Sequence, residues 1–334
     1  MTWNNPMRTT KTMRRGLFVA VLAGVALMLA ACGGAGEPEL EKSYDMTAEE
    51  VAPNVYAVVS PSKGFPNEEN RGWNSNMAFV VTDDGVLVFD TGTSDAIGES
   101  LKATIREVTD EPIRWIVNSH GHGDHWLGNA TLAGDETAIL ASEEARGIIE
   151  DDGQTWVDRV AQMTDGTAGE TTVLPPNETV TENESRELGG VTVEFRLLGT
   201  AHSPGDMALW LPEQEVLLAA DVAYGNAAPA TMDADVRHWV DTLEELEALD
   251  PAVVIPGHGE LGDARILADL RGYLDTFWNE VESGFDRGQQ DFQMRDDVEE
   301  ALADYAERYP NFDDRVGESL SHIYLQVEQA AFGG

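Results

Sequence analysis

Residues 120–125 read His-Gly-His-Gly-Asp-His and concentrate metal-ligand side chains in a chain that has seven histidines in all. His120 and His122 are two residues apart, so on an extended loop both imidazoles face the same side and can share one metal ion. Asp124 and His125 follow directly and are expected to turn toward a second ion, while the intervening glycines allow the tight backbone that this crowding needs. Because core packing gives no reason for so dense a run, the motif predicts a metal site.

Apolar runs that are typical of β-strands precede this motif and three further polar residues. Segments with helical spacing alternate with these runs, at residues 96–108, 143–160 and 236–249. The alternation predicts an α/β fold, in which loops at the ends of strands carry the functional residues. The runs span residues 113–117, 191–198, 216–220 and 253–255, and they lead to His120, His202, Asp221 and His258, respectively.

The chain changes character after Asp263, where only helical spacing remains. Apolar residues recur at that spacing within residues 266–277, 298–305 and 320–331. We therefore expect a main domain over residues 51–263 and a helical C-terminal extension over residues 264–334, packed on it.

The first 31 residues differ in composition from the rest of the chain. Their only charged side chains are basic, and an apolar run follows at residues 17–30. This pattern is typical of a signal peptide over residues 1–31, because the run is too short to span a membrane comfortably. It ends in Leu-Ala-Ala-Cys-Gly, which resembles a bacterial lipobox with Cys32 as the lipidated residue.

We therefore expect an exported bacterial lipoprotein, periplasmic or on the cell surface, that is membrane-anchored through Cys32. Residues 32–50 would form the lipidated N-terminus and a tether. The alternative is a chance thiol beside an uncleaved anchor helix. Because Cys32 is the single cysteine of the chain, disulfides are excluded and any metal ligand must be a histidine or a carboxylate.

The formal net charge of −40 limits the partners of this chain. Phosphate groups would be repelled, which excludes nucleic acid and anionic lipid. We expect a small-molecule substrate, and contact with a membrane only through the lipid anchor at Cys32. Adaptation of a solvated acidic surface to a salty medium explains the excess, since salt screens the self-repulsion.

The motifs resemble those of the metallo-β-lactamase superfamily, whose signature is His-x-His-x-Asp-His followed by three isolated ligands in fixed order. His202 resembles the third ligand of the first zinc, Asp221 the bridging carboxylate, and His258 the last ligand of the second zinc. Asp90, in Asp-Thr-Gly, resembles the aspartate of an early loop that supports the site. The resemblance implies an αββα sandwich and two Zn²⁺ per chain, with the ligands His120, His122, Asp124, His125, His202, Asp221 and His258.

The same resemblance implies hydrolysis by a metal-bridging hydroxide, because two zinc ions acidify a shared water. Asp124 would be the catalytic residue that orients this nucleophile or relays its proton. Asp221 stands where dedicated β-lactamases carry Cys or Ser, and the layout is most similar to the secreted SoxH and quinoprotein-relay group. We expect a dinuclear zinc hydrolase that cleaves an ester, thioester, lactone or lactam bond.

Two alternatives stay open at this point. Histidine and carboxylate ligands also accept iron, which would make the protein an iron-dependent sulfur or redox enzyme on the same fold. A non-catalytic lipoprotein that binds metal is the other alternative.

Several aromatic and histidine residues lie outside the ligand set. Trp73, Trp126 and Tyr224 fall in or beside loops that flank the predicted metals, so they are candidates for the apolar wall of a pocket. His238 and His322 lie within helical patterns, and we expect them to pack or to face solvent.

Overall fold

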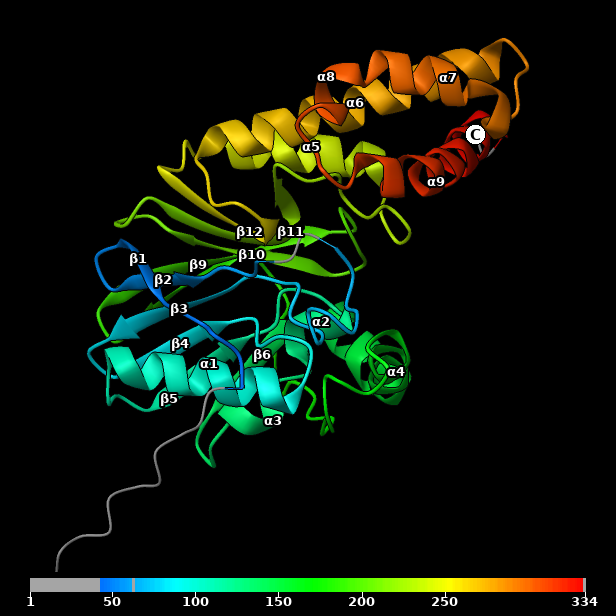
Figure 1. Cartoon of the computed structure of the whole chain (residues 1–334). Coiled ribbons are helices and arrows are strands. Elements are labelled where there is room, and N and C mark those ends of the chain that lie inside the picture. Colours follow the sequence, from blue (N-terminus) through cyan, green and yellow to red (C-terminus); the bar gives the residue numbers. More distant parts are fainter. Residues whose placement is uncertain (1–42, 62–63, 333–334) are drawn as a thin grey trace, which may run out of the picture. The chain divides into compact units, whose positions relative to one another are not determined.

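The computed structural model describes residues 43–61 and 64–332. Within these residues the alternating strands and helices form two β-sheets that pack face to face, with helices on both outer faces (Figure 1). This arrangement is the predicted αββα sandwich. The predicted signal peptide of residues 1–31, the lipidated Cys32 and most of the tether lie outside the described residues.

Among the described residues, seven strands form the first sheet and five form the second. In the first sheet, β4 to β7 pair in parallel, and in the second sheet β11 and β12 do so; the other neighbours are antiparallel. The first sheet has the order β1 (Glu49–Ala52), β2 (Val55–Val58), β3 (Met77–Thr82), β4 (Gly85–Phe89), β5 (Ile113–Val117), β6 (Ala138–Ser142) and β7 (Glu178–Val180). The second has the order β12 (Val253–Gly259), β11 (Val216–Gly225), β10 (Asp206–Leu211), β9 (Val191–Gly199) and β8 (Glu184–Leu188).

Aliphatic side chains from both sheets meet in the layer between them. Val80 and Leu87 of the first sheet are buried together with Leu209, Leu218 and Ile255 of the second. Full burial of one such side chain contributes about 1.5–3 kcal/mol, so this layer is a main source of stability. It also fixes the two sheets against each other, and with them the ends of their strands.

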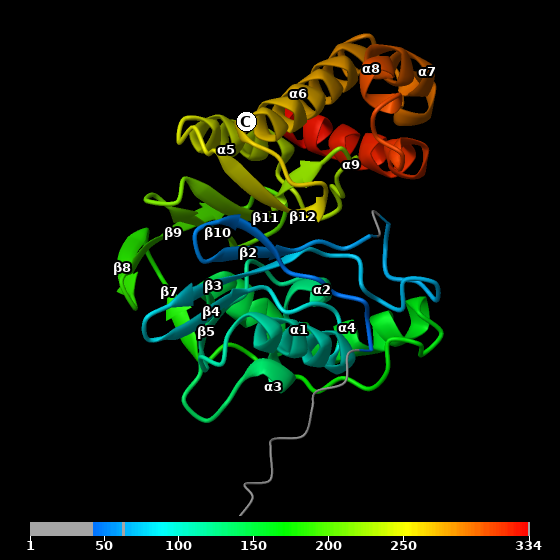
Figure 2. The ribbon, with the colours of Figure 1, turned by 60° about the vertical axis from the view of Figure 1, so that its left-hand side comes forward.

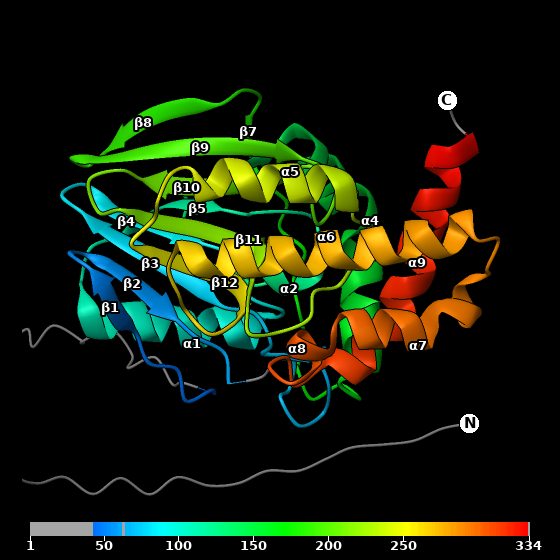
Figure 3. The same ribbon diagram turned by 90° about the horizontal axis from the view of Figure 1, so that it is seen from above.

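Amphipathic helices cover the outer faces. Helix α1 (Asp95–Val108) buries Ile97, Leu101 and Ile105 against the first sheet, and the Ser94 hydroxyl caps its first turn by accepting from the Ile97 N–H. Helix α5 (Val236–Glu247) lies beside α6 (Ala264–Asp286) over the second sheet (Figure 3). The remaining helices of this part are α2 (Gly123–Trp126), α3 (Asn129–Leu132) and α4 (Glu143–Met163).

The predicted C-terminal extension is helical, as expected. It starts with α6 and continues through α7 (Asp291–Ala301), α8 (Ala303–Ala306) and α9 (Phe312–Phe332). Helix α9 returns to pack on α6 and α7 (Figure 2), and Val316 and Leu320 share one buried cluster with Tyr273 and Phe277. No described helix has both the length and the apolar character that crossing a bilayer requires.

The structure corrects the expectation that every candidate ligand lies in a loop after a strand. Asp221 lies inside β11 and His258 inside β12, because pairing of the two strands continues past a register shift and joins Tyr224 to His258. The motif also leaves the extended conformation at Gly123, where α2 begins. Asp124 and His125 follow each other in this helical turn, and Oδ2 of Asp124 lies 3.7 Å from Nε2 of His125.

Candidate metal centre

All seven predicted ligands come together at one edge of the sandwich. The first sheet supplies His120 and His122 from the turn after β5, and Asp124 and His125 from α2. The second sheet supplies His202 from the turn after β9, Asp221 from within β11 and His258 from within β12. Their ligand atoms form three groups, each within 4.8 Å: His120, His122 and His202; His120, His125 and Asp221; and Asp124, His125 and His258.

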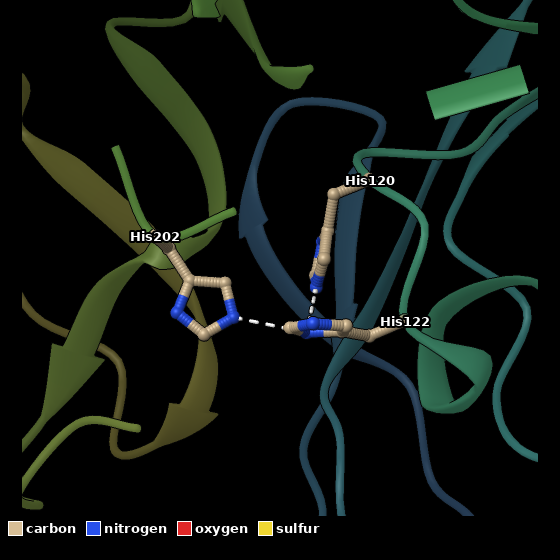
Figure 4. A group of neighbouring side chains, drawn as sticks. All are labelled: His120, His122 and His202. Atoms are coloured by element: carbon tan, nitrogen blue, oxygen red, sulfur yellow. Dashed lines mark hydrogen bonds between the residues drawn. The ribbon is translucent and has the colours of Figure 1, made fainter. Parts of the chain in front are cut away.

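The first group has the geometry of a metal site (Figure 4). The Nδ1 atom of His122 lies 3.1 Å from Nε2 of His120 and 3.1 Å from Nε2 of His202. Ligands at about 2.0–2.1 Å from a tetrahedral zinc ion are separated by roughly 3.3 Å, so these nitrogens stand at the spacing that one ion sets.

Hydrogen bonds on the far side of two rings fix which nitrogen faces the centre. The Ser119 hydroxyl lies 2.9 Å from Nδ1 of His120, and Asp233 Oδ2 lies 3.0 Å from Nε2 of His122. Partners of this kind set the tautomer and the orientation of a ligating imidazole. Asp233 belongs to no sequence motif, and sequence reasoning missed it.

Asp221 lies between two candidate metal positions. The first position is formed by His120, His122 and His202, and the second by Asp124, His125 and His258. Its Oδ1 is 3.1 Å from Nε2 of His125, and its Oδ2 is 3.1 Å from Nε2 of His258 and 3.4 Å from Nε2 of His202. Asp124 completes the second position, with Oδ2 at 3.5 Å from Nε2 of His258. One carboxylate therefore faces ligands of both groups, which suits a bridge between two cations.

Two buried atoms test whether this donor set fits metal ions. Nε2 of His125 and Oδ1 of Asp221 have no hydrogen-bond partner among the described residues, although they lie 3.1 Å apart. Buried polar atoms are rarely left without a partner, because the lost solvation is costly. Cations held between these atoms would satisfy both, so the residues fit a metal pair.

Asp90 and Asn74 support the second position from behind. Asp90 accepts from Nδ1 of His125 at 2.8 Å and from the Ser119 N–H at 2.8 Å. The Asn74 side-chain amide donates to Oδ2 of Asp124 at 2.8 Å, and its backbone carbonyl lies 2.9 Å from Nδ1 of His258. The place of Asp90 agrees with the supporting role that the resemblance implies.

The protonation of the histidines differs between the two groups. Burial lowers the pKa of His120 well below the usual value, and the neighbouring His125 and His122 lower it further. Burial likewise lowers the pKa of His202 to about 3, although Asp221 opposes the shift. Both rings are neutral at pH 7 and present a free lone pair to a metal ion.

Burial disfavours a charge on His125 and His258 as well, but the carboxylates of Asp221 and Asp124 together, with that of Asp90 at His125, outweigh it and raise the pKa of each histidine. Conversely, burial raises the pKa of Asp221, yet His258 and His125 outweigh it and leave that pKa well below the usual value. In the metal-free protein the second position is therefore a network of ion pairs. Cation binding requires the two histidines to release their protons.

A cavity opens over the metal centre. Of the predicted wall residues only Tyr224 lines it, with its hydroxyl donating to Oδ2 of Asp221 at 2.8 Å. Trp126 is fully buried and donates to the Gly121 carbonyl, and Trp73 lies in the core cluster under α1. Side chains that sequence reasoning missed form much of the wall: Phe65, Pro66, Trp156, Arg159, Val160, Met163, Met232 and Arg315.

The two remaining histidines lie away from this centre. Nε2 of His238 is 2.8 Å from the Leu198 carbonyl, and Nδ1 of His322 is 3.3 Å from the Thr231 hydroxyl. His238 of α5 is exposed and contacts β9, while His322 of α9 is half-buried and contacts the loop after β11, in line with the expectation that these residues pack or face solvent.

The fold and the centre together define a metal-dependent hydrolase. The model of a family described as the metallo-beta-lactamase superfamily matches residues 70–258, more than half of the chain. The chain belongs to this superfamily.

Individual relatives are distant. A metallo-beta-lactamase type 2 of Bacteroides fragilis is 24% identical over 269 residues, which cover 78% of this chain and 95% of the relative. A linear primary-alkylsulfatase of Pseudomonas sp. (strain ATCC 19151) is 25% identical over 212 residues, 53% of this chain and 40% of the relative.

A solved structure of a stereoselective inverting sec-alkylsulfatase from Pseudomonas sp. is similar in fold. It has a TM-score of 0.62 and 20% identity, and the match covers 86% of this chain and 50% of that one. This chain thus spans half or less of the alkylsulfatases that it matches.

Proposed function

We propose that the protein is a dinuclear zinc hydrolase that cleaves an ester, thioester, lactone or lactam bond of a small molecule. The observation that carries this proposal is the place of Asp221, whose two oxygens face ligands of both candidate metal positions. When bound, two zinc ions supply an acidified water and a polarised substrate oxygen. The cavity over the centre offers room for the substrate.

The chain's own residues have separate tasks in this reaction. Asp124 is held by the Asn74 amide, and its pKa is lowered: burial raises it, but His125 and His258 outweigh the burial. Asp124 is therefore a carboxylate at neutral pH, able to orient an attacking water and to accept its proton. Asp221 is an oxygen ligand rather than a thiolate, and this supports a hydrolase other than a dedicated β-lactamase.

We also propose that the chain is an exported lipoprotein, periplasmic or on the cell surface, anchored through Cys32. The lipobox and the basic, apolar start of the sequence support this. The surplus of acidic residues supports a small-molecule substrate rather than nucleic acid, which the surface would repel.

Metal analysis tests the cofactor. Protein purified without added metal should contain about two zinc ions per chain, as a dinuclear site requires. One iron per chain would replace this proposal with the iron-dependent alternative.

A hydrolysis screen tests the activity. Zinc-loaded protein is assayed on lactams, lactones, thioesters, carboxylic esters, phosphoesters and sulfate esters, the last because of the alkylsulfatase relatives. Asp124→Asn should lower turnover by at least a hundredfold, in the range of lost general acid-base catalysis. Asp313→Asn, at an exposed position of α9, is the matched control and should retain full turnover. Absence of turnover above Asp124→Asn on every class would overturn the hydrolase proposal.

A further inference from the structure

The C-terminal extension contributes a cation to the cavity over the metal centre. Arg315, in the first turn of α9, lines this cavity together with Asp124, Asp221 and His258. It lies outside residues 70–258, the part of the chain that the family model matches. The extension therefore adds a side chain that the shared domain does not provide.

Arg315 is buried without a full set of partners. It is 7% exposed, and its Nη1 has no hydrogen-bond partner among the residues that the structure describes. The carboxylate of Glu318 lies 3.8 Å away, beyond hydrogen-bond distance, and the Phe65 ring lies 3.6 Å below the guanidinium. Burial of a charge that lacks such partners is costly, and a bound anion would remove that cost.

Paired hydrogen bonds hold α9 against the loop between β11 and α5. The Asn311 side chain accepts from the Ala228 N–H at 2.8 Å and donates to its carbonyl at 2.9 Å. Further along α9, the Gln326 side chain accepts from the Val236 N–H at 3.0 Å and donates to the Ala234 carbonyl at 2.9 Å. The loop between β11 and α5, which places Met232 in the cavity, is thereby tied to the helix that carries Arg315.

The rest of the cavity wall is largely apolar. Phe65, Trp156, Met163 and Met232 line it, and Arg159, which is exposed and lies over the Trp156 ring, is the second cation among the described lining residues. An apolar cavity with a buried arginine is complementary to a molecule that has both an apolar part and an anionic group.

We propose that Arg315 binds an anionic oxygen group, carboxylate or sulfate, of an amphiphilic substrate whose apolar part fills this cavity. The inference rests on the proposed function, since it names the class of substrate for the same site. The proposed anion site depends on the C-terminal extension, because α9 supplies Arg315. The ligands of the metal centre, by contrast, come from the part of the chain that forms the two sheets.

Binding can be tested without turnover. Titration calorimetry with zinc-loaded full-length protein compares octanoate, octyl sulfate and the neutral 1-octanol. Arg315→Met retains length and apolar contact but removes the charge. It should weaken binding of at least one anion by tenfold or more, while the affinity for octanol stays within twofold. Octanoate and octyl sulfate serve as separate arms that tell a carboxylate preference from a sulfate preference.

The matched control is Arg295→Met, which removes an exposed arginine of α7 that pairs with Glu299. It should leave all three affinities unchanged. Thermal unfolding of Arg315→Met should be unchanged or shifted upward, because a poorly paired buried charge is removed. Equal anion binding by wild type and Arg315→Met, no anion binding by either, or parallel loss of octanol binding overturns the inference. Failure of the hydrolysis screen with anion binding intact would overturn the proposed function alone.

Discussion

Gly257 shows how closely the backbone approaches the metal centre. A Cβ atom at this position would overlap Oδ1 of Asp221 and would lie 2.8 Å from the Asp221 backbone nitrogen. Neither neighbour can move without displacing the carboxylate that lies between the two candidate metal positions. Glycine is therefore required by space, just before His258 in the sequence.

Gly257→Ala should lower the free energy of unfolding by about 1–3 kcal/mol, the usual cost of overpacking, and should reduce the zinc content. Gly147→Ala in α4 is the control, because a Cβ there meets nothing within 4 Å. The control should gain about 0.5–1 kcal/mol, as expected of alanine in a helix. Denaturant unfolding and metal analysis measure both, and wild-type metal content in Gly257→Ala would contradict the steric argument.

Asp206 makes the stability of the metal-free protein depend on pH. Burial raises its pKa to about 7, although hydrogen bonds from Ser203 and from the His202 N–H oppose the shift. The unfolded chain loses this proton near pH 3.9. Between these values the folded state binds more protons than the unfolded state, so stability falls as pH rises from about 4 to about 7.

Asp206→Asn removes this titration and keeps an oxygen for the two backbone N–H donors. Stability curves of chelator-treated wild type and variant should therefore diverge with rising pH. The wild type should lose up to about 4 kcal/mol relative to Asp206→Asn across this range. Parallel curves from pH 4 to pH 7 would show that the carboxyl is already ionised at the lower value.

The residues that sequence reasoning identified and missed differ in a physical way. The dense motif and the positions of His202, Asp221 and His258 after apolar runs indicated the ligand set, since metal binding restricts both residue type and spacing. No sequence pattern identifies Arg315, because arginine is common in amphipathic helices. Only the path of the folded chain places it in the cavity.

At the scale of elements, strand lengths were the least predictable feature. The apolar run of β11 ends near Ala220, but the strand continues to Gly225 because β12 supplies backbone partners beyond a register shift. The short strands β1, β7 and β8 were not predicted either. Their residues alternate little between apolar and polar, and pairing with a neighbouring strand, rather than their own sequence, defines them.

The link between α9 and the loop after β11 is an element-scale feature that can be tested. Asn311→Ala removes both hydrogen bonds to the Ala228 backbone, each worth about 0.5–1.5 kcal/mol. Hydrogen exchange should become faster in residues 226–235 and stay unchanged in residues 120–125. Asn279→Ala, which removes an exposed contact with Asp275 on α6, is the control and should alter neither segment. Uniformly faster exchange would indicate global destabilisation instead.

At the scale of the whole molecule, the αββα layering follows from features that the sequence displays. Strand-like runs alternate with amphipathic helices, and the sheets bury the apolar faces between them. The return of α9 toward the cavity was not predictable, because several packings bury the same apolar stripe of a helix. Tertiary contacts such as those of Asn311 and Gln326 select one of them.

The net charge of −40 is the remaining whole-molecule property, and it predicts a response to salt. Acidic side chains repel one another more in the compact state than in the expanded unfolded chain. The screening length falls from about 10 Å at 0.1 M salt to about 3 Å at 1 M, so the repulsion is largely removed. The melting temperature of the zinc-loaded protein should rise by several degrees between 0.1 M and 1 M NaCl. Sucrose at equal osmolality is excluded from the protein surface but does not screen charge, so it should raise the melting temperature less. An equal rise in sucrose would refute an electrostatic origin.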